Sequence, residues 1–326
     1  AKINMIVSKT KSANIVMSLN SRNAIGTIVI GAHFDHLGMG EYGSRTPNRR
    51  EVHNGADDNT SGVASIIEIG RLFSKNRKNL KYNIIIAAFG AEEKGLLGSK
   101  AFSDSLKKAS KLPSIMFNLD MVGRLVDNKL QVGGTGTFTG ADSLVNKINE
   151  IAGFKLSVTK GGTGASDHSS FYSTGVPVLY FTTGVHQQYH TPDDDIDLIN
   201  FEGMAKVCDF VYDISSEVAK GSFKPFFTKV AASEDEPVRT SFKVSLGVVP
   251  DFTYEAGDGF RIGAVSDGKP ASKAGLLSGD IITSMNGKGV KNIYEYMARL
   301  GELKSGDLVD VIIKRDDKIL NYKIQL

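Results

Sequence analysis

Residues 27–36 are TIVIGAHFDH, an apolar run that ends in histidine and aspartate. A continuous apolar run of this kind is typical of a strand that is buried on both faces, as in parallel sheets. We expect strands at Thr27–Ala32, Asn83–Phe89, Ile115–Leu119 and Val176–Phe181. Because segments of helical period separate these runs, the sequence up to about residue 220 predicts an α/β fold with a mainly parallel sheet flanked by helices.

Two of the expected helices have a clear apolar face. One covers Val63–Phe73 after the capping candidates Thr60 and Ser61, and the other covers Phe201–Tyr212. The second places Cys208, the only cysteine, on its apolar face, so we expect this thiol in the core. A single cysteine also excludes an internal disulfide and a thiolate zinc site.

The composition is that of an ordinary globular protein. Hydrophobic residues make up 41% of the 326 residues and charged residues 23%, which disfavours a disordered chain. The net charge is +3 and no basic run is interleaved with aromatic residues, so neither nucleic acid nor an anionic membrane surface is an expected partner. No transmembrane segment is expected, and residues 1–30 lack the pattern of a signal peptide.

The pattern changes after residue 220. Residues 221–240 lose periodicity and include the acidic SEDEP stretch, which predicts a linker between a domain at 1–220 and a second at 241–326. In the second domain we expect strands at Asp280–Met285, before an Asn-Gly turn, and at Leu308–Lys314, with a helix near Tyr294–Leu300.

Five potential metal ligands lie at the ends of the expected strands or in loops, where open α/β sheets place their sites. Two imidazoles and three carboxylates suit zinc, with manganese or cobalt as alternatives. The set is too rich for one ion, so we expect two zinc ions per chain, about 3.5–4 Å apart and bridged by one carboxylate. The candidates are His33 in GAHFDH, Asp57 in NGADDNTSG, Glu93 in FGAEEKG, Asp120 in NLDMVG and His190 in QYHTPDD, with Asp57 as the bridge.

Two further acids are candidates for catalytic roles. Asp35 lies two residues after His33, so its side chain is expected on the same side, where it would hold the second ring N–H of the histidine. Glu92 precedes the ligand candidate Glu93 and is the expected general base, pointing at the bridging water without coordinating.

The other histidines carry weaker signals. His53 and His186 are interpreted as loop residues, and His36 as a neighbour of the site. For His168 a role near the site or substrate pocket is weighed evenly against helix capping. The glycine-rich stretches 133–140 and 161–164 lack the Gly-Lys-Ser/Thr of a phosphate loop and are expected to border the cleft.

Residues 13–219 resemble the zinc-dependent aminopeptidase family that includes secreted bacterial leucyl aminopeptidases, with glutamate carboxypeptidase, glutaminyl cyclase and transferrin receptor as relatives. The motifs that carry the resemblance are HxD, GADDN, the Glu-Glu pair, NLDMVG and the histidine before Thr-Pro. The resemblance implies a phosphorylase/hydrolase-like sheet, one zinc on His33 and Asp120, the other on His190 and Glu93, with Asp57 bridging and a cis peptide to Asp58.

The resemblance also implies Glu92 as the base and Tyr189 as a hydrogen-bond donor to the oxyanion. Family members usually have further N-terminal helices, which are absent from this sequence. Whether a longer N-terminal region has been removed is therefore left open. Periplasmic or extracellular localisation is expected from the same resemblance.

Residues 241–326 resemble a PDZ domain, a small β-rich fold. The carboxylate-binding loop is expected at Leu246, Gly247, Val248 and Val249, and the block 268–288 matches the helix-turn-strand part. The resemblance implies a ligand with a free C-terminal end, which adds as a strand beside that loop. A domain that docks without binding peptide is the alternative.

An aminopeptidase acting on peptide substrates is therefore the leading hypothesis. Glutaminyl cyclase usually needs a Trp-lined pocket, and this sequence has no tryptophan. A carboxypeptidase would use cationic groups, for which Arg45, Arg49, Arg50 and Arg124 are candidates. A PDZ adaptor with a vestigial catalytic domain is the non-enzymatic alternative.

Overall fold

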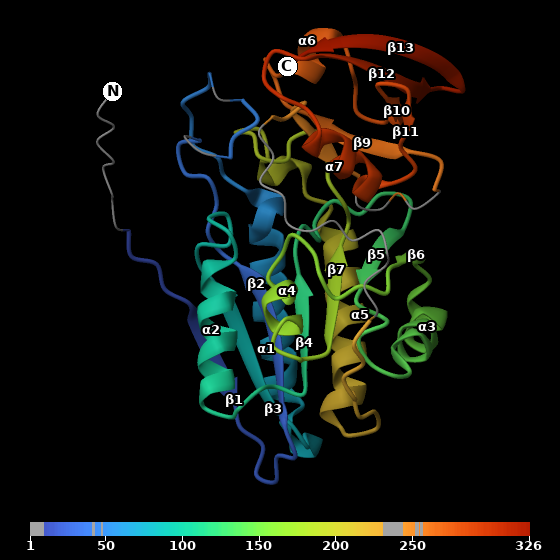
Figure 1. Ribbon diagram of the computed structural model, residues 1–326. Coiled ribbons are helices and arrows are strands. Elements are labelled where there is room, and N and C mark those ends of the chain that lie inside the picture. Colours follow the sequence, from blue (N-terminus) through green and yellow to red (C-terminus); the bar gives the residue numbers. More distant parts are fainter. Residues whose placement is uncertain (1–9, 41–42, 47, 231–243, 252–253, 255–256) are drawn as a thin grey trace.

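The computed structural model describes residues 10–40, 43–46, 48–230, 244–251, 254 and 257–326 (Figure 1). Two separate sheets divide these residues into an N-terminal unit, 10–230, and a C-terminal unit, 244–326. Much of the expected linker, from 231 onward, lies outside the described residues. Within the described part of the chain, no helix is both long and apolar enough to span a bilayer.

The N-terminal unit is built on a seven-stranded sheet in the order β1-β3-β2-β4-β7-β5-β6. The central strands β3, β2, β4 and β7 are parallel to one another, whereas β1 pairs antiparallel with β3, and β5 antiparallel with β7. The strands are β1 Ile15–Leu19, β2 Thr27–His33, β3 Asn83–Phe89, β4 Ile115–Leu119, β5 Lys129–Gly133, β6 Lys155–Val158 and β7 Val178–Thr182. The prediction of a mainly parallel sheet is confirmed.

Helices cover both faces of this sheet (Figure 1). On one face α1 packs on α5, and α3 packs on α5, over a core that includes Phe73, Phe117 and Phe210. On the other face α2 and α4 pack together over Phe89, Met116 and Phe171. The helices are α1 Gly62–Lys75, α2 Leu97–Lys108, α3 Ala141–Ala152, α4 His168–Tyr172 and α5 Phe201–Ala219. Cys208 is buried in α5, as predicted.

The C-terminal unit has a six-stranded antiparallel sheet with its own core. Its path runs β13-β12-β10-β9-β8, and β11 pairs with β10. The elements are β8 Val248–Pro250, β9 Phe260–Val265, α6 Pro270–Ala274, β10 Ile281–Met285, β11 Lys288–Gly289, α7 Ile293–Gly301, β12 Leu308–Arg315 and β13 Lys318–Gln325. The core residues include Leu246, Ile282, Tyr296 and Val311.

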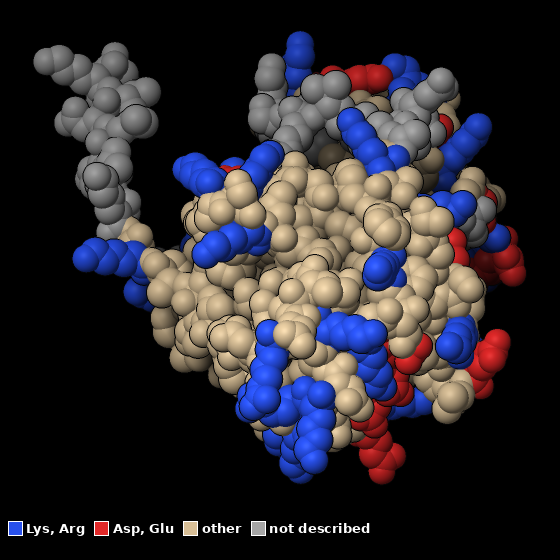
Figure 2. Space-filling model, turned by 90° about the horizontal axis from the view of Figure 1, so that it is seen from below, with Lys and Arg blue, Asp and Glu red and all other residues tan. Residues whose placement is uncertain are grey.

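Lys and Arg side chains are spread over the end remote from the C-terminal unit (Figure 2), where α1 and the short helix after it finish with Lys75, Arg77 and Lys78. The C-terminal unit lies at the other end of the parallel strands (Figure 1), beside the carboxyl ends that carry the candidate site.

Candidate metal centre and cavity

The predicted site residues come together at the carboxyl edge of the parallel strands. His33 is the last residue of β2, Glu92 and Glu93 follow β3, and Asp120 follows β4. Carboxyl ends of neighbouring parallel strands meet at one edge of a sheet, which explains why residues so distant in sequence converge there.

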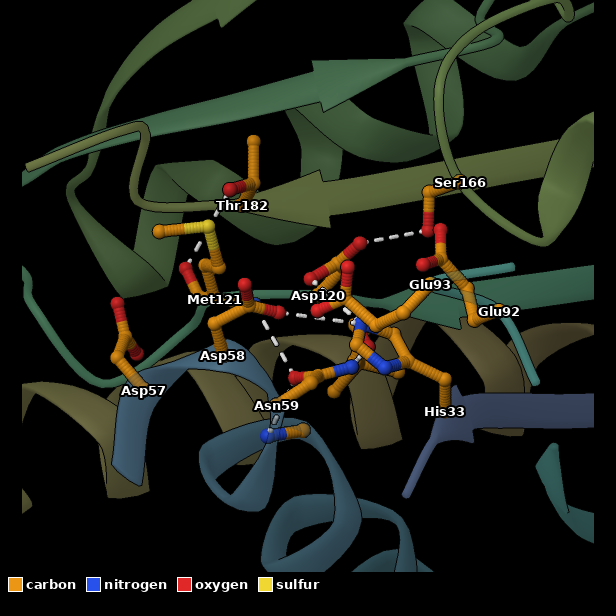
Figure 3. A network of polar contacts seen from close by, with 12 residues as sticks. His33, Asp57, Asp58, Asn59, Glu92, Glu93, Asp120, Met121, Ser166 and Thr182 are labelled. Atoms are coloured by element: carbon orange, nitrogen blue, oxygen red, sulfur yellow. Dashed lines mark hydrogen bonds and ion pairs between the residues drawn. The ribbon is translucent and has the colours of Figure 1, made fainter. Parts of the chain in front are cut away.

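One group of potential metal ligands contains His33, Asp58 and Asp120. The Nε2 atom of His33 lies 3.2 Å from Asp58 Oδ1 and 3.5 Å from Asp120 Oδ1. All three side chains are buried. Ser166 donates to the other oxygen of Asp120 at 2.6 Å, so this carboxylate is held in place (Figure 3).

A second group forms around the other oxygen of Asp58. His190 Nε2 lies 3.2 Å from Asp58 Oδ2 and 3.3 Å from Glu93 Oε2. His36 is also near, with Nδ1 2.9 Å from Glu93 Oε1 but 3.8 Å from Asp58 Oδ2. We favour His190 as the ligand candidate here, because one of its nitrogens faces both carboxylates while Nδ1 donates to the Gly43 carbonyl at 3.0 Å.

The expectation that Asp57 bridges the two positions is wrong, and Asp58 occupies that place. Asp57 lies apart from the converging side chains (Figure 3), accepts the Gly123 N–H at 2.6 Å and faces His186 Nε2 at 3.3 Å. The cis peptide likewise follows Asp58, joining it to Asn59, rather than preceding it. His186 is therefore a loop residue that contacts Asp57.

Sequence reasoning missed two side chains that hold this loop. Asp194 is fully buried and accepts the backbone N–H groups of Asp57 and Asp58, each at 3.0 Å. Asn59 accepts from Met121 N at 3.2 Å and donates to the Leu119 carbonyl at 3.0 Å, which ties the loop to the end of β4. The available signal for Asp194 was the acidic run that follows His190.

A further correction concerns Asp35. The His33 ring donates from Nδ1 to the backbone carbonyl of Asp35 at 3.1 Å, not to its carboxylate. The Asp35 carboxylate instead accepts the N–H groups of Glu92 at 2.9 Å and Glu93 at 3.3 Å. Asp35 thus orients the glutamate pair with its side chain and the histidine with its main chain. Ser61, expected to cap α1, also differs: its hydroxyl donates to the Asp57 carbonyl at 2.8 Å.

Glu92 lies in the cavity wall near His33 and Asp120. Burial raises the pKa of Glu92 to about 9, and the neighbouring acids Asp120 and Asp167 add to the shift while His33 opposes it. A bound cation next to this carboxyl would favour its ionised form. The position and the sensitivity to charge suit a proton carrier.

The carboxylates of the site stabilise positive charge, as the raised pKa values of two imidazoles show. Burial lowers the pKa of His190, but its contacts with Asp58 and Glu93 raise that pKa to about 10. For His33 burial also lowers the pKa, yet Asp120 and Asp58 raise it well above its usual range. The donors are nitrogen and oxygen only. This donor set fits divalent zinc, which would be held by His33, Asp58 and Asp120 on one side.

Zinc binding should therefore release protons. A metal ligand must be deprotonated, and the raised pKa of His190 means that this ring carries a proton at neutral pH before metal binds. We expect the apparent zinc affinity to rise with pH, by up to about tenfold per pH unit for each proton released. Calorimetry at pH 6, 7 and 8 in buffers of different ionisation enthalpy measures both quantities. An affinity that does not change with pH would contradict the assignment.

Other predicted residues lie around the centre. The ring of Tyr189 stacks on His190 with centroids 3.8 Å apart and lines the cavity. His168 stacks on Tyr180 at 4.5 Å and lines the cavity too, so of its two interpretations the pocket position is the observed one. His53 contacts the Glu51 carbonyl and Ser44, as expected of a loop residue.

The centre opens into a cavity of about 470 Å³ that both units line. The N-terminal unit contributes four acids, Asp58, Glu92, Glu93 and Asp120, together with residues of the predicted loop 161–164. The C-terminal unit contributes the end of β8, the start of β9 and the start of α7, including Arg261 and Lys291. The cavity thus has its metal-binding residues on one wall, and on the other wall Arg261 and Lys291 together with Asp251, whose Oδ2 lies 3.6 Å from Arg261 Nε.

Of the predicted carboxylate-binding loop, Leu246 and Gly247 precede β8, whereas Val248 and Val249 belong to β8, which ends the six-stranded path. Leu246 is fully buried, and Gly247 adopts φ 77°, a conformation that favours glycine. The Gly247 N–H donates to Ser245 Oγ at 3.0 Å. The outer edge of β8 carries no further strand among the described residues, and strand addition takes place at an edge of this kind.

Comparison with known families agrees with this architecture. The model of peptidase family M28 matches residues 14–215, and the model of the PDZ domain matches residues 243–326. The C-terminal unit is thus a PDZ domain, with the antiparallel sheet described above.

Individual relatives match the N-terminal unit. Aminopeptidase YwaD of Bacillus subtilis (strain 168) is 34% identical over 183 residues, which are 52% of this chain and 39% of that protein. The crystal structure of BSAP, a zinc aminopeptidase from Bacillus subtilis, has 30% identity and a TM-score of 0.53 over 65% of this chain and 51% of that one. Glutaminyl cyclase of Porphyromonas gingivalis shares the fold, with a TM-score of 0.54 at 24% identity over 63% of this chain and 77% of that one.

The chain spans about half or less of the length of the aminopeptidases that it matches. The family model nevertheless covers more than half of the 326 residues and includes all the residues that form the two donor groups. With its histidine and carboxylate cluster at the carboxyl edge of a mainly parallel sheet, the chain belongs to peptidase family M28.

Proposed function

We propose that this protein is an aminopeptidase that removes the N-terminal residue of peptides with the help of two zinc ions. The observation that carries the proposal is the position of Asp58, whose two oxygens face two separate donor groups, His33 with Asp120 and His190 with Glu93. A shared carboxylate with one histidine and one acid on each side is the arrangement of a two-metal hydrolase.

Bound zinc would polarise the scissile carbonyl and lower the pKa of the attacking water. Glu92 accepts the proton of that water and returns it to the leaving amine, because it lies in the cavity wall without belonging to either donor group. Burial raises the pKa of Tyr189 well above its usual range, so its hydroxyl stays protonated and can donate to the developing oxyanion.

The acidic end of the cavity accounts for N-terminal specificity. Glu92 lines this end and belongs to neither donor group, so with metal bound its ionised carboxylate can pair with the protonated α-amine of a substrate. The four arginines considered for a carboxypeptidase are not among the lining residues. The guanidinium of Arg45 donates to the carbonyls of Gln187 and Tyr189, and Arg49 pairs with Glu51 and Asp193.

Blocking the α-amine tests the proposal. Acetylation of a peptide such as Leu-Ala-Ala should abolish its hydrolysis, since a neutral terminus leaves the acidic end of the cavity unpaired. Product release from the free and the acetylated peptide, measured by chromatography on the zinc-loaded protein, gives the comparison. Equal turnover of the two would point to an endopeptidase or amidase, and cyclisation of N-terminal glutamine would point to glutaminyl cyclase.

A further inference from the structure

The groove of the C-terminal unit and the catalytic cavity form one continuous path. The groove is bounded by β8 and α7, whose apolar residues Val248, Ile293 and Met297 are half-buried and pack against the same core cluster. Pro250 at the end of β8 and Ile293 at the start of α7 both line the catalytic cavity. One end of the groove therefore opens into the cavity, and the other end lies at the loop before β8.

The far end of the groove suits a carboxylate. Lys269 packs against Gly247, so that its Cβ and Cγ fill the space that a side chain on the glycine would take. This places a cationic side chain at the start of the open edge of β8. A backbone turn of this kind next to a strand edge is where a peptide C-terminus is held by main-chain N–H groups.

The direction of a bound peptide follows from these two ends. If the terminal carboxylate lies at Gly247, the rest of the peptide extends along β8 toward Pro250, and its N-terminus points into the cavity. The N-terminus then meets Glu92, which lines the cavity and belongs to neither donor group. An acid thus faces the N-terminus of the peptide, and Lys269 lies near its C-terminus.

Contacts between the two units fix this alignment. The buried guanidinium of Arg45 donates to the Tyr189 carbonyl at 2.9 Å and to the Val265 carbonyl at the end of β9. The Arg45 carbonyl accepts from Asp267 N at 3.1 Å, and Arg45 N donates to the His190 carbonyl at 2.9 Å. Val265 in turn pairs with Val248 of β8. The two contacts of Arg45, with Val265 and with Asp267, therefore connect the groove to the loop that carries Tyr189 and His190.

We propose that the PDZ domain acts as a ruler, holding the C-terminus of a short peptide at Gly247 and Lys269 so that its N-terminus reaches the metal centre. This inference rests on the proposed aminopeptidase function. An extended peptide advances about 3.3 Å per residue, so about four residues lie beside Gly247–Pro250 and a few more in the cavity. The preferred substrates are peptides of roughly five to eight residues with both ends free.

A length series tests the ruler. Peptides with N-terminal leucine followed by one to nine alanines are compared as free acids and as C-terminal amides. We expect the acid to have a kcat/KM on the order of tenfold higher than the amide at five to eight residues, chiefly through KM, and nearly equal values for the dipeptide, since a hydrogen bond to a charged group is worth about that factor. An acid-to-amide ratio that is the same at every length would overturn the proposal.

Two variants locate the effect. Lys269→Gln should lower the acid-to-amide ratio at five to eight residues to about two, whereas Lys273→Gln, at an exposed lysine on the helix α6 that Lys269 precedes, should leave it unchanged. Equal losses for acids and amides in Lys269→Gln would contradict a carboxylate contact. Turnover of leucine p-nitroanilide, which is too short to reach β8, measures the proposed aminopeptidase function separately in each variant.

Inhibition supplies an independent measurement. An N-acetylated heptapeptide with a free C-terminus should inhibit leucine p-nitroanilide turnover competitively, because one molecule occupies groove and cavity together. Its C-terminal amide should inhibit on the order of tenfold less. Binding of the acid without inhibition, or with purely noncompetitive inhibition, would show that the groove serves a separate ligand and would overturn the ruler. Absence of any p-nitroanilide turnover would instead refute the proposed function.

Discussion

Glu92→Gln should lower kcat by roughly 10²–10⁴-fold while the protein keeps its zinc content. Glu92 lines the cavity near His33 and Asp120, yet it belongs to neither donor group. The amide keeps the shape of the side chain but cannot carry the proton. Steady-state kinetics with leucine p-nitroanilide, together with metal analysis of the same sample, separates loss of the base from loss of metal.

Glu150→Gln is the matched control for this variant. Glu150 is exposed on α3, so the same chemical change there should alter neither kcat nor zinc content. Near-full activity of Glu92→Gln would show that another group moves the proton. Loss of zinc from Glu92→Gln would show that Glu92 is a ligand.

Asp58→Asn and Asp57→Asn should differ sharply, although the residues are adjacent. Asp58 faces both histidines, so Asp58→Asn should weaken both zinc positions by more than the roughly 10–100-fold that follows the loss of a supporting residue. Activity should fall by about 10³-fold or more. Asp57→Asn keeps an oxygen that can accept from Gly123 N, so zinc content should hold and activity should change by less than about tenfold.

Zinc titration and residual activity of the two variants give the comparison, with circular dichroism as a check that both proteins fold. If Asp57→Asn loses zinc and Asp58→Asn retains it, the structural assignment of the shared carboxylate is wrong. If both lose zinc equally, the loop acts as a unit and neither residue is the bridge alone.

The parallel core was predictable because its signal is local. The runs at Asn83–Phe89 and Ile115–Leu119 match β3 and β4 residue for residue, since strands buried on both faces need continuous apolar sequence. β5 and the edge strand β6 carry more polar residues, and β6 is half exposed. No comparable apolar run marked them, so they were not predicted.

The sequence predicted which motifs form the site, but not every residue or atom that makes the contacts. Which of two adjacent aspartates faces the histidines depends on contacts made far away in sequence, above all the bonds from Asp57 N and Asp58 N to Asp194. The same limit applies to Asp35, where the position two residues after His33 was right but the contacting atom was the main-chain carbonyl. Spacing identifies the neighbourhood, whereas tertiary hydrogen bonds decide the atom.

Arg45 sets a condition for domain exchange in protein engineering. Its guanidinium is buried, and burial lowers its pKa, so each of its donors needs an acceptor. In the C-terminal unit, the Val265 carbonyl accepts from the Arg45 guanidinium, and the Asp267 N–H donates to the Arg45 carbonyl. A chimera that carries a different PDZ domain must offer a carbonyl and an N–H at these two points. Without them an unpaired charge is left beneath the loop that carries Tyr189 and His190. Chimeras in a shuffled library would then lose catalysis because of a defect at this interface, although every active-site residue is unchanged.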